Sequence, residues 1–280
     1  MAYGVFAIHD AGIKLLVVDL PVWQILFFRS ATILIVCLAI GRGTLVMRAV
    51  NTPLKTALAS RALINLTAWL CYYTAARSLP LGQLLCLYFG APAMVTVMAW
   101  RLLKEQVTPS RWISVGIGFA GVLFATDPLG IQASTPTMLV LIAAALWGYG
   151  VILMRQIAQK EPALLQMLAS NTVFLIGTGL ACAVEWHPVT PFQFGTLIAV
   201  SIAGGIAQFL VFETARLIPA SVMATVEYSA LPWAFLLGYW IWRDIPSLAV
   251  WTGAGLIVIA GAVLIRAERR ASPPKPLPHG

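Results

Sequence analysis

The two halves of this chain carry the same short motif. The segment Ala76–Pro80 (ARSLP) returns 139 residues further on as Ala215–Pro219 (ARLIP). Each copy precedes an apolar segment that contains a proline, Pro92 in the first half and Pro232 in the second. Internal duplication in an apolar chain is typical of secondary transporters. The repeat therefore predicts a duplicated membrane unit.

The composition indicates that lipid, and not water, surrounds most of this chain. Hydrophobic residues make up 60% of the 280 residues and charged residues 10%, whereas a soluble domain carries about 25% charged residues. The net charge of +8 does not indicate a nucleic-acid partner, because the basic residues lie between apolar blocks, where they act as topology signals. We therefore expect the lipid bilayer as a partner and no nucleic acid.

The cysteines predict neither a metal site nor a cofactor site. Cys37, Cys71, Cys86 and Cys182 all lie within apolar runs, without a CxxC pair or a histidine at metal-ligand spacing. Each is interpreted as a small apolar side chain.

Ten apolar runs of this chain are candidates for membrane-spanning helices, which need about 20 residues each. The first run is the weakest, but aligning Pro21 with Pro162 pairs Phe6 with Trp147 and so relates the first run to the sixth. The predicted spans are 3–18, 21–40, 57–77, 80–100, 110–127, 136–156, 162–184, 192–213, 219–241 and 247–266.

The distribution of lysine and arginine predicts the orientation, because an excess of basic residues marks the cytoplasmic side. The loops after the odd-numbered spans hold only Arg77 and Arg243. We therefore expect a multi-pass protein of the bacterial inner membrane with both termini in the cytoplasm. The opposite loops and the C-terminal tail hold 14 basic residues: Arg42, Arg48, Lys55, Arg61, Arg101, Lys104, Arg111, Arg155, Lys160, Arg216, Arg266, Arg269, Arg270 and Lys275.

Five spans in each copy predict an inverted duplication. An odd number of crossings places the second unit upside down relative to the first, so that Arg77 and Arg216 lie on opposite faces of the membrane. We expect one five-helix unit over 1–128, a second over 136–266 and a proline-rich disordered cytoplasmic tail over 267–280. The predicted fold class is an all-α membrane protein with ten transmembrane helices in two inverted repeats.

Polar side chains within the spans are the candidates for a functional site, because burying them in lipid is costly. Glu227 suits a proton site or a counter-ion for a substrate ammonium; alternatively, it is a protonated carboxyl bonded to a neighbouring helix. His9 and Asp10 are adjacent, so their side chains diverge by about 100° and are not expected to pair. His9 is either a substrate ligand or an interhelical donor, and Arg29 is interpreted as a lock between helices.

One face of the third span combines an amide with aromatic rings. Asn65, Trp69 and Tyr72 or Tyr73 recur at helical spacing, and Gln208 occupies the repeat-equivalent position on the eighth span. Amides and rings on facing helices suit an amphipathic solute with an apolar body, and ordinary helix packing is the alternative. We therefore predict that this face lines a pocket.

The two internal prolines predict hinges or further binding positions. A proline inside a helix leaves the carbonyl four residues earlier without its donor, which concerns Tyr88 for Pro92 and Tyr228 for Pro232. A freed carbonyl can bind a solute or let the helix bend during gating; alternatively, water or a neighbouring hydroxyl satisfies it. We expect Pro92 and Pro232 as gating residues, with Tyr88 and Tyr228 in the pocket.

Short motifs recur in equivalent places of the two halves. They are ARSLP at 76–80, GAP at 90–92, LKE at 103–105 and the glycines from 116 to 121, then WG at 147–148, ARLIP at 215–219, ALP at 230–232, RD at 243–244 and AG at 260–261. With these motifs both copies resemble the EamA repeat of the drug/metabolite transporter superfamily. The resemblance implies ten helices, cytoplasmic termini, a central cavity lined by spans one, three, four, six, eight and nine, and export or exchange of small metabolites. Within the superfamily the chain is most similar to the YddG group, which exports aromatic amino acids and related compounds.

These patterns predict an alternating-access exporter of amino acids, aromatic or otherwise apolar, and not an enzyme. Rings would contact the substrate's side chain, amides and His9 its polar backbone, and Glu227 its ammonium or a coupling proton. The predicted substrate-binding residues are His9, Asn65, Trp69, Tyr73, Tyr88, Trp147, Gln208, Glu227 and Tyr228.

Other functions are kept as alternatives. Within the superfamily these are a multidrug or other small-metabolite exporter and a nucleotide-sugar carrier, although few arginines are available in the cavity for a phosphorylated substrate. A channel and an intramembrane enzyme are distant alternatives; for the enzyme, the chain lacks an HExxH or GxSxG motif.

Overall fold

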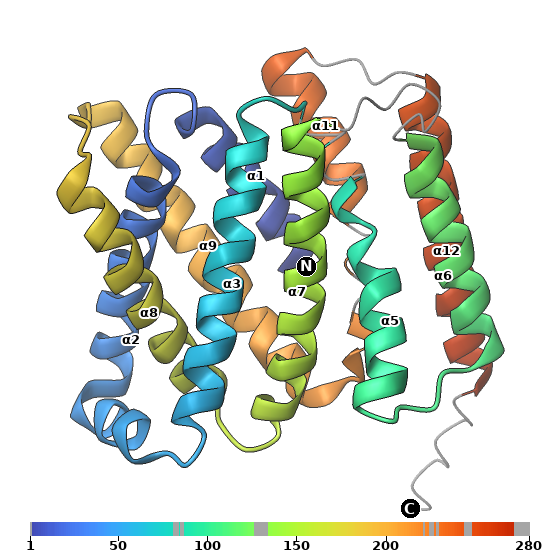
Figure 1. The fold of residues 1–280 in the computed structure, drawn as a ribbon, viewed down its shortest axis with the longest axis horizontal. Helices are drawn as coiled ribbons and strands as arrows, with labels where there is room; N and C mark the ends of the chain where they lie inside the picture. The colour runs from blue at the N-terminus through green and yellow to red at the C-terminus, as the bar shows by residue number, and fades with distance from the viewer. Residues whose placement is uncertain are drawn as a thin grey trace, which may run out of the picture.

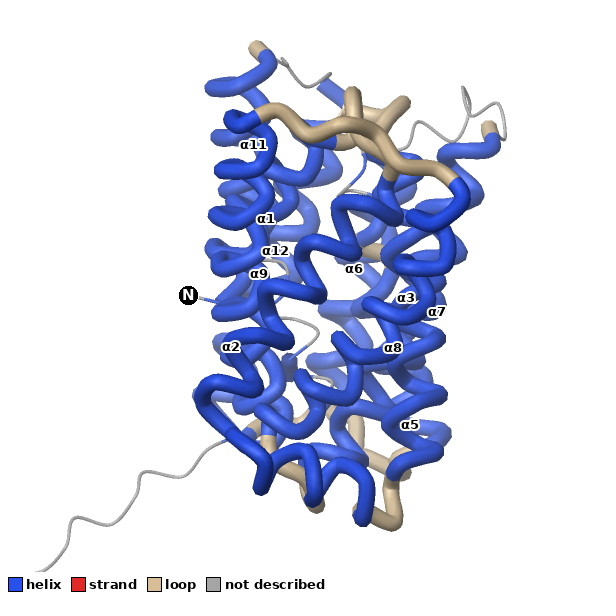
Figure 2. The backbone as a smooth tube through the Cα atoms, turned by 90° about the vertical axis from the view of Figure 1, so that its left-hand side faces the viewer, coloured by secondary structure: helices blue, strands red, loops and turns tan. Residues whose placement is uncertain are grey.

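Helices account for most of the chain, as its apolar periodic segments require. The computed structural model describes residues 2–80, 84, 87–125, 134–220, 222–223, 227, 230–243 and 248–271, and over these ranges it contains no strand. The helices run side by side along one direction (Figure 1; Figure 2). The all-α prediction is confirmed for the described residues, whose helices are α1 (Ala2–Leu16), α2 (Val22–Asn51), α3 (Lys55–Ala76), α5 (Ala91–Leu102), α6 (Pro109–Ala125), α7 (Thr135–Ala158), α8 (Ala163–Val184), α9 (Pro191–Leu217), α11 (Ala230–Trp242) and α12 (Leu248–Ala271).

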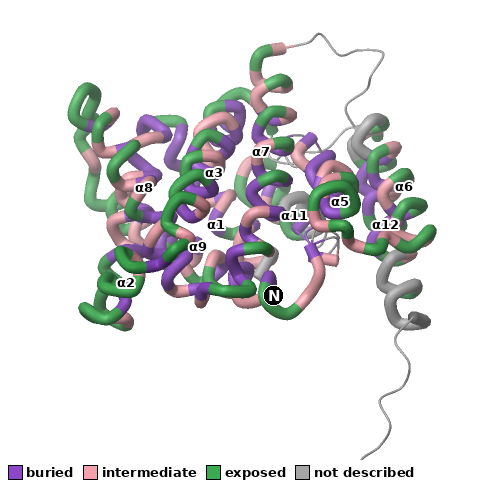
Figure 3. Tube along the Cα trace, turned by 60° about the horizontal axis from the view of Figure 1, so that its bottom comes forward, coloured by how far each residue is buried: buried purple, intermediate pink, exposed green. Residues whose placement is uncertain are grey.

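The exterior of the bundle carries many large apolar side chains. Ile35, Leu180 and Val184 are 68%, 71% and 90% exposed, and exposed positions follow the outward side of the peripheral helices (Figure 3). Extensive exposed apolar surface marks contact with a membrane or a partner. Among the described helices, α2, α7, α8 and α9 are long and apolar enough to cross a membrane. The chain is therefore a multi-pass membrane protein.

The fourth predicted span is interrupted. Residues 87–88 are helical, Phe89 and Gly90 form a turn, and α5 begins at Ala91. Pro92 therefore stands in the first turn of α5. A backbone N–H at this position would have no acceptor within the helix, so its absence in proline costs no hydrogen bond. The prediction that Pro92 frees the Tyr88 carbonyl inside a continuous helix is wrong. The physical reason is that Gly90, a poor helix former, ends the preceding segment.

The ninth predicted span restarts in the same manner. Glu227 lies in a 3₁₀ turn and α11 begins at Ala230, so Pro232 also stands in the first turn of a helix. Its predicted partner Tyr228 lies outside the described residues. Both prolines thus follow breaks in their spans instead of kinking a continuous helix.

Two helix ends differ from the predicted boundaries. The helix α2 continues to Asn51, past the predicted end at 40, through Arg42 in a left-handed conformation with φ of 49°. Its added turns mix apolar and basic residues, a composition typical of a helix at a membrane interface. The helix α12 includes residues 267–271, which were predicted as disordered tail; their sequence, AERRA, consists of good helix formers.

Arg61 is a buried helix residue and does not belong to a loop, as the orientation argument assumed. It is 1% exposed and lies in the second turn of α3. Its Nη1 donates to the hydroxyl of Ser170 at 3.1 Å, and its guanidinium lies 4.6 Å from the ring centroid of Phe212. Arg61 therefore connects α3 with α8 and α9.

The helices pack mainly across the two halves of the chain. The helix α2 packs against α8, and α6 packs against α12. In the first half, α1 packs against α9 and α11. Its counterpart in the second half, α7, packs against α3 and α5. The α6–α12 pair approaches closely (Figure 1): a Cβ at Gly121 would lie 2.7 Å from the carbonyl oxygen of Gly253. These pairs between the two halves are unchanged when each helix is exchanged for its counterpart in the other half.

Candidate substrate pocket

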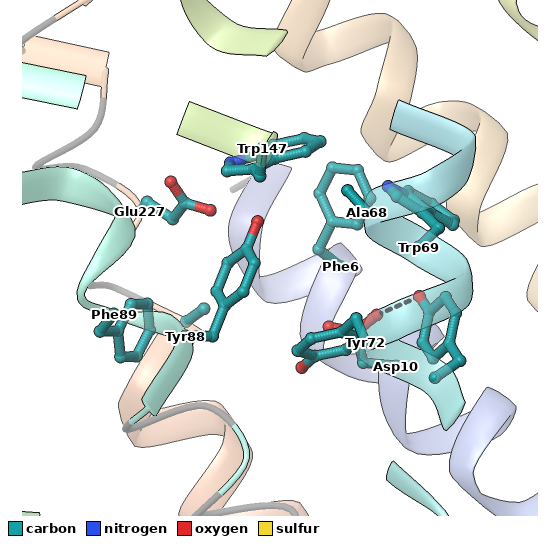
Figure 4. Close-up of a pocket in the computed structure, with 11 residues that line it drawn as sticks. Phe6, Asp10, Ala68, Trp69, Tyr72, Tyr88, Phe89, Trp147 and Glu227 are labelled. Atoms are coloured by element: carbon teal, nitrogen blue, oxygen red, sulfur yellow. Dashed lines mark hydrogen bonds between the residues drawn. The ribbon is translucent and has the colours of Figure 1, made fainter. Parts of the chain in front are cut away.

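A pocket lies among α1, α3, α7 and the two interrupted spans (Figure 4). Its cavity of about 60 Å³ leaves room for a few water molecules. This conformation is therefore contracted, and an aromatic substrate requires the lining helices to move apart. The lining residues are Phe6, Asp10, Ala68, Trp69, Tyr72, Tyr73, Tyr88, Phe89, Trp147, Glu227 and Ala230.

The aromatic rings of the lining form a continuous series. The ring centroid of Tyr72 lies 5.1 Å from those of both Tyr73 and Tyr88. Tyr88 continues to Trp147 at 6.4 Å, and Tyr73 to Trp69 at 5.5 Å. Tilted and edge-to-face pairs of this kind contribute about 0.5–1.5 kcal/mol each beyond their buried area. The series offers apolar ring faces to a flat ligand.

The carboxylate of Asp10 forms one polar end of the pocket. Its Oδ1 accepts a hydrogen bond of 2.8 Å from the Tyr73 hydroxyl (dashed in Figure 4) and lies 3.2 Å from Nδ1 of His9. The prediction that His9 and Asp10 cannot pair is therefore wrong. Although the two side chains leave the helix in different directions, Nδ1 is the ring nitrogen nearest the backbone and the short Asp10 side chain reaches it.

Arg29 lies behind His9 and is 1% exposed. Its Nε donates to His9 Nε2 at 3.2 Å, its Nη2 donates to Gln208 Oε1 at 3.3 Å, and its guanidinium lies 4.2 Å from the ring centroid of Trp69. Arginine only donates, so Nε2 of His9 is the acceptor and Nδ1 carries the proton toward Asp10. The structure thus places a neutral imidazole between a cation and a carboxylate. These contacts agree with the interpretation of Arg29 as a lock between helices.

The predicted amides, Asn65 and Gln208, lie between helices and do not line the pocket. Gln208 Oε1 also accepts from Asn171 Nδ2 at 3.3 Å. Asn65 faces α7, where a Cβ at Gly150 would lie 2.6 Å from its Oδ1. That Oδ1 is buried and has no hydrogen-bond partner among the described residues. Neither amide side chain reaches the cavity in this conformation.

Glu227 forms the second polar end of the pocket and is 5% exposed. Its carboxyl lies beside the indole of Trp147, with the hydroxyl of Tyr88 directed toward the same corner (Figure 4). In the described part of the chain, the hydroxyl of Tyr72 is buried without a hydrogen-bond partner. An unpaired buried polar group costs roughly 1–3 kcal/mol, which a ligand can relieve.

The structure brings together part of the predicted set. His9, Asn65 and Gln208 lie outside the lining, and Tyr228 lies outside the described residues. The predicted residues that line the pocket are Trp69, Tyr73, Tyr88, Trp147 and Glu227.

Several lining residues are absent from the predicted set. Phe6 could have been found from its alignment with Trp147 between the two halves. Tyr72 was named only as an alternative to Tyr73 on the face of the third span, and both line the pocket. Asp10 carries a signal as an acid within a span. Phe89 has no such signal, because only the break before α5 turns it toward the pocket.

Comparison with known proteins identifies the class of this chain. Residues 3–126 match the sequence profile of the EamA-like transporter family. A riboflavin transporter of Brucella anthropi is 25% identical over 89% of this chain and 88% of its own length. An S-adenosylmethionine uptake transporter of Rickettsia bellii is 22% identical over 88% and 82%, and the pseudopaline exporter CntI of Pseudomonas aeruginosa 23% over 96% and 95%.

A solved crystal structure has the same fold. It superposes with a TM-score of 0.72 at 16% identity and covers 96% of this chain and 98% of its own. The family match agrees with the EamA resemblance and confirms the prediction that the chain is not an enzyme. The chain is a membrane transporter whose residues 3–126 match the EamA-like transporter family.

Proposed function

We propose that this protein is an inner-membrane alternating-access transporter that exports aromatic or other apolar amino acids and related metabolites. The observation that carries the proposal is the pocket itself, in which a series of aromatic rings lies between the carboxylates of Asp10 and Glu227. The rings of Trp69, Tyr88 and Trp147 contact the apolar body of the substrate. Glu227 binds its ammonium or a coupling proton.

His9, Asn65 and Gln208 act on the substrate indirectly in this proposal. His9 holds the carboxylate of Asp10 at 3.2 Å, and Gln208 holds the guanidinium of Arg29 at 3.3 Å. These contacts fix the wall of the pocket on the side of α1 and α3. The open Oδ1 of Asn65 becomes available to the substrate backbone when α3 and α7 move apart.

Two inverted five-helix repeats, over 1–128 and 136–266, support alternating access. The exchange of helix pairs between the two halves supports a two-fold relation between the repeats, which an axis in the membrane plane would provide. Lys104 and Arg243, which follow equivalent helices, have similar left-handed φ angles of 53° and 58°. Cysteines introduced at Arg77 and Arg216 test the inversion. We expect a membrane-impermeant reagent to label the two sites from opposite sides of the membrane. Labelling of both sites from the same side would contradict the inversion.

Polar contacts between the two halves close the bundle at both ends and suit a pair of gates. At the lower end in Figure 1, Glu161 accepts hydrogen bonds from Thr52 and, at 3.2 Å, from Nε of Arg48. At the upper end, the Gln24 amide donates to the carbonyl of His187 at 2.7 Å and accepts from its N–H at 3.0 Å. Opening one set at a time gives access to the pocket from one side. The excess of basic residues supports a cytoplasmic location of the lower end and of both termini.

A multidrug exporter is the second candidate. The pocket combines two carboxylates with aromatic rings and, within its described lining, has no basic side chain. That chemistry favours cationic amphipathic compounds. The relatives move compounds as different as riboflavin, S-adenosylmethionine and pseudopaline, so pocket chemistry has to decide the substrate.

Transport into proteoliposomes tests the proposed function. We expect saturable uptake of labelled tryptophan or phenylalanine above empty vesicles. Trp147→Ala removes a ring from the pocket and should abolish most of that uptake, whereas Trp240→Ala, at a position 73% exposed on α11, should not. Folded protein that transports no amino acid above empty vesicles would overturn the proposal.

A further inference from the structure

The pocket lining is unbalanced in charge. Its described residues include two carboxylates, Asp10 and Glu227, and no lysine, arginine or histidine. A buried carboxylate requires an opposite charge or a proton. The two carboxylates differ in whether the protein supplies that charge.

Asp10 receives its positive charge from the protein. Arg29 donates to His9 Nε2 at 3.2 Å, and His9 Nδ1 lies 3.2 Å from Asp10 Oδ1. One imidazole therefore connects the guanidinium to the carboxylate. The Tyr73 hydroxyl adds a hydrogen bond of 2.8 Å to the same oxygen. Asp10 does not need a cation from the ligand.

Glu227 receives no such charge. It takes part in none of the ion pairs formed by the described residues. Its neighbours in the lining, Trp147 and Tyr88, are neutral (Figure 4). With a carboxyl that is buried and directed into the pocket, Glu227 is the position at which a ligand cation completes the site.

A ligand carboxylate finds no cation in the described lining. The open group there is neutral: the hydroxyl of Tyr72 lacks a hydrogen-bond partner among the described residues. It can donate to a carbonyl oxygen. A carboxylate at the same place would add a third negative charge beside Asp10 and Glu227, and like charges in a poorly solvated site repel strongly.

We propose that the pocket selects compounds with an aromatic body, one protonated amine and no free carboxylate, such as arylalkylamines and the amides or esters of aromatic amino acids. Glu227 binds the amine, and the hydroxyl of Tyr72 binds a neutral oxygen where the ligand has one. The inference rests on the proposed function, because it assigns a substrate class to the same pocket.

Four ligands with the same indole ring test the inference. Tryptamine and tryptophanamide carry a charge of about +1, tryptophan is a zwitterion, and indole-3-propionate carries about −1 at neutral pH. Isothermal titration against the protein in lipid nanodiscs measures their affinities. We expect the two amines to bind on the order of tenfold more tightly than tryptophan, and indole-3-propionate to bind most weakly. Binding of tryptophan as tight as that of its amide would overturn the inference.

A pair of glutamate variants assigns the preference to one residue. Glu227→Gln should reduce the affinity of both amines to about that of tryptophan. The matched control is Glu213→Gln on α9, where the carboxylate lies outside the pocket lining and pairs with Arg216 at 3.2 Å; it should keep the preference. A folded Glu227→Gln protein that still prefers the amines would contradict the inference. If that variant does not fold, the ranking of the four ligands on the unaltered protein decides.

Transport of the same ligands separates the inference from the proposed function. Uptake of tryptophan without any preference for amines would overturn the inference and leave the proposed function intact. Uptake of the amines without tryptophan would support the inference and replace amino acids as the substrate. Four ligands that neither bind nor move would overturn both.

Discussion

The hydroxyl of Tyr73 donates a 2.8 Å hydrogen bond to the carboxylate of Asp10, which joins the third helix of the chain to the first. The same carboxylate contacts His9, which accepts from Arg29. Tyr73, in the wall of the pocket, is thereby connected to the buried guanidinium of Arg29 on α2. The geometry of the pocket depends on this chain of polar contacts.

Tyr73→Phe should destabilise the protein by about 1.5–3 kcal/mol, because it removes a hydrogen bond to a charged group. Thermal unfolding in detergent measures the effect. Tyr239→Phe, at a position 52% exposed on α11, is the control and should change stability little. Equal stability of the two variants would contradict the role given to Tyr73.

Arg29→Met should cost about 3 kcal/mol, because it leaves His9 and Gln208 without their donor and the partly buried carboxylate of Asp10 without its balancing charge. Arg29→Lys should not restore stability, since an ammonium lacks the fork that reaches both His9 and Gln208. Arg216→Met is the matched control, because Arg216 is 46% exposed at its side chain and pairs with Glu213 on its own helix. Denaturant unfolding of the three variants measures these losses. An equal loss of stability for Arg29→Met and Arg216→Met would contradict the role given to Arg29.

Gly204→Ala should disrupt the same contacts from the side of α9. A Cβ at this position would lie 2.5 Å from Cδ2 of His9 and 3.1 Å from Nε of Arg29, so the ring has to move. We expect a loss of at least about 1–3 kcal/mol from overpacking. Gly255→Ala on α12 has nothing within 4 Å and should gain about 0.5–1 kcal/mol from helix propensity. Melting temperatures that change in the same direction would rule out this account.

The contacts of Glu161 should differ in strength because their exposure differs. Thr52 is buried, whereas the side chain of Arg48 is 56% exposed and screened by solvent. We therefore expect Thr52→Val to cost about 1–3 kcal/mol and Arg48→Ala no more than about 1 kcal/mol. Unfolding measurements at low and high salt provide the comparison, and only the Arg48 variant should lose its effect at high salt.

Tyr72→Phe should leave stability unchanged or raise it slightly. The Tyr72 hydroxyl is buried without a partner in the described part of the chain, so its removal relieves a desolvation cost. The affinity for tryptophanamide should fall a few-fold and that for tryptamine should not change, because only the amide has an oxygen for this hydroxyl. A parallel loss for both ligands would place the hydroxyl elsewhere in the site.

The residues of the candidate site show which parts of it local sequence can predict. Glu227 was predicted from its type and depth, because a carboxylate inside a span needs a cavity or a partner, whereas Trp147 was predicted from the repeat and the family resemblance. His9, Asn65 and Gln208 satisfied the same rule and yet lie outside the lining. Their partners are a guanidinium from another helix and, for Asn65, the surface of α7. A rule based on polarity identifies buried groups and does not distinguish a ligand contact from a helix contact.

The prolines show the same limit for the backbone. Pro92 and Pro232 marked the right segments, because a proline constrains the four residues before it. Whether the span bends or breaks depends on the preceding residues and on what surrounds them. Gly90 ends the segment before α5, and the break turns Phe89 toward the pocket.

Amino-acid composition and hydrophobic period sufficed for an all-helical chain with an apolar exterior, because backbone groups within a bilayer must be satisfied inside each segment. The choice of neighbours depended on the tertiary structure. Pairing of α2 with α8, and of Arg29 with His9 and Asp10, joins groups that no local pattern relates. Helix formation involves contacts four residues apart, whereas charge balance in the pocket is a property of side chains that meet only after the helices have packed.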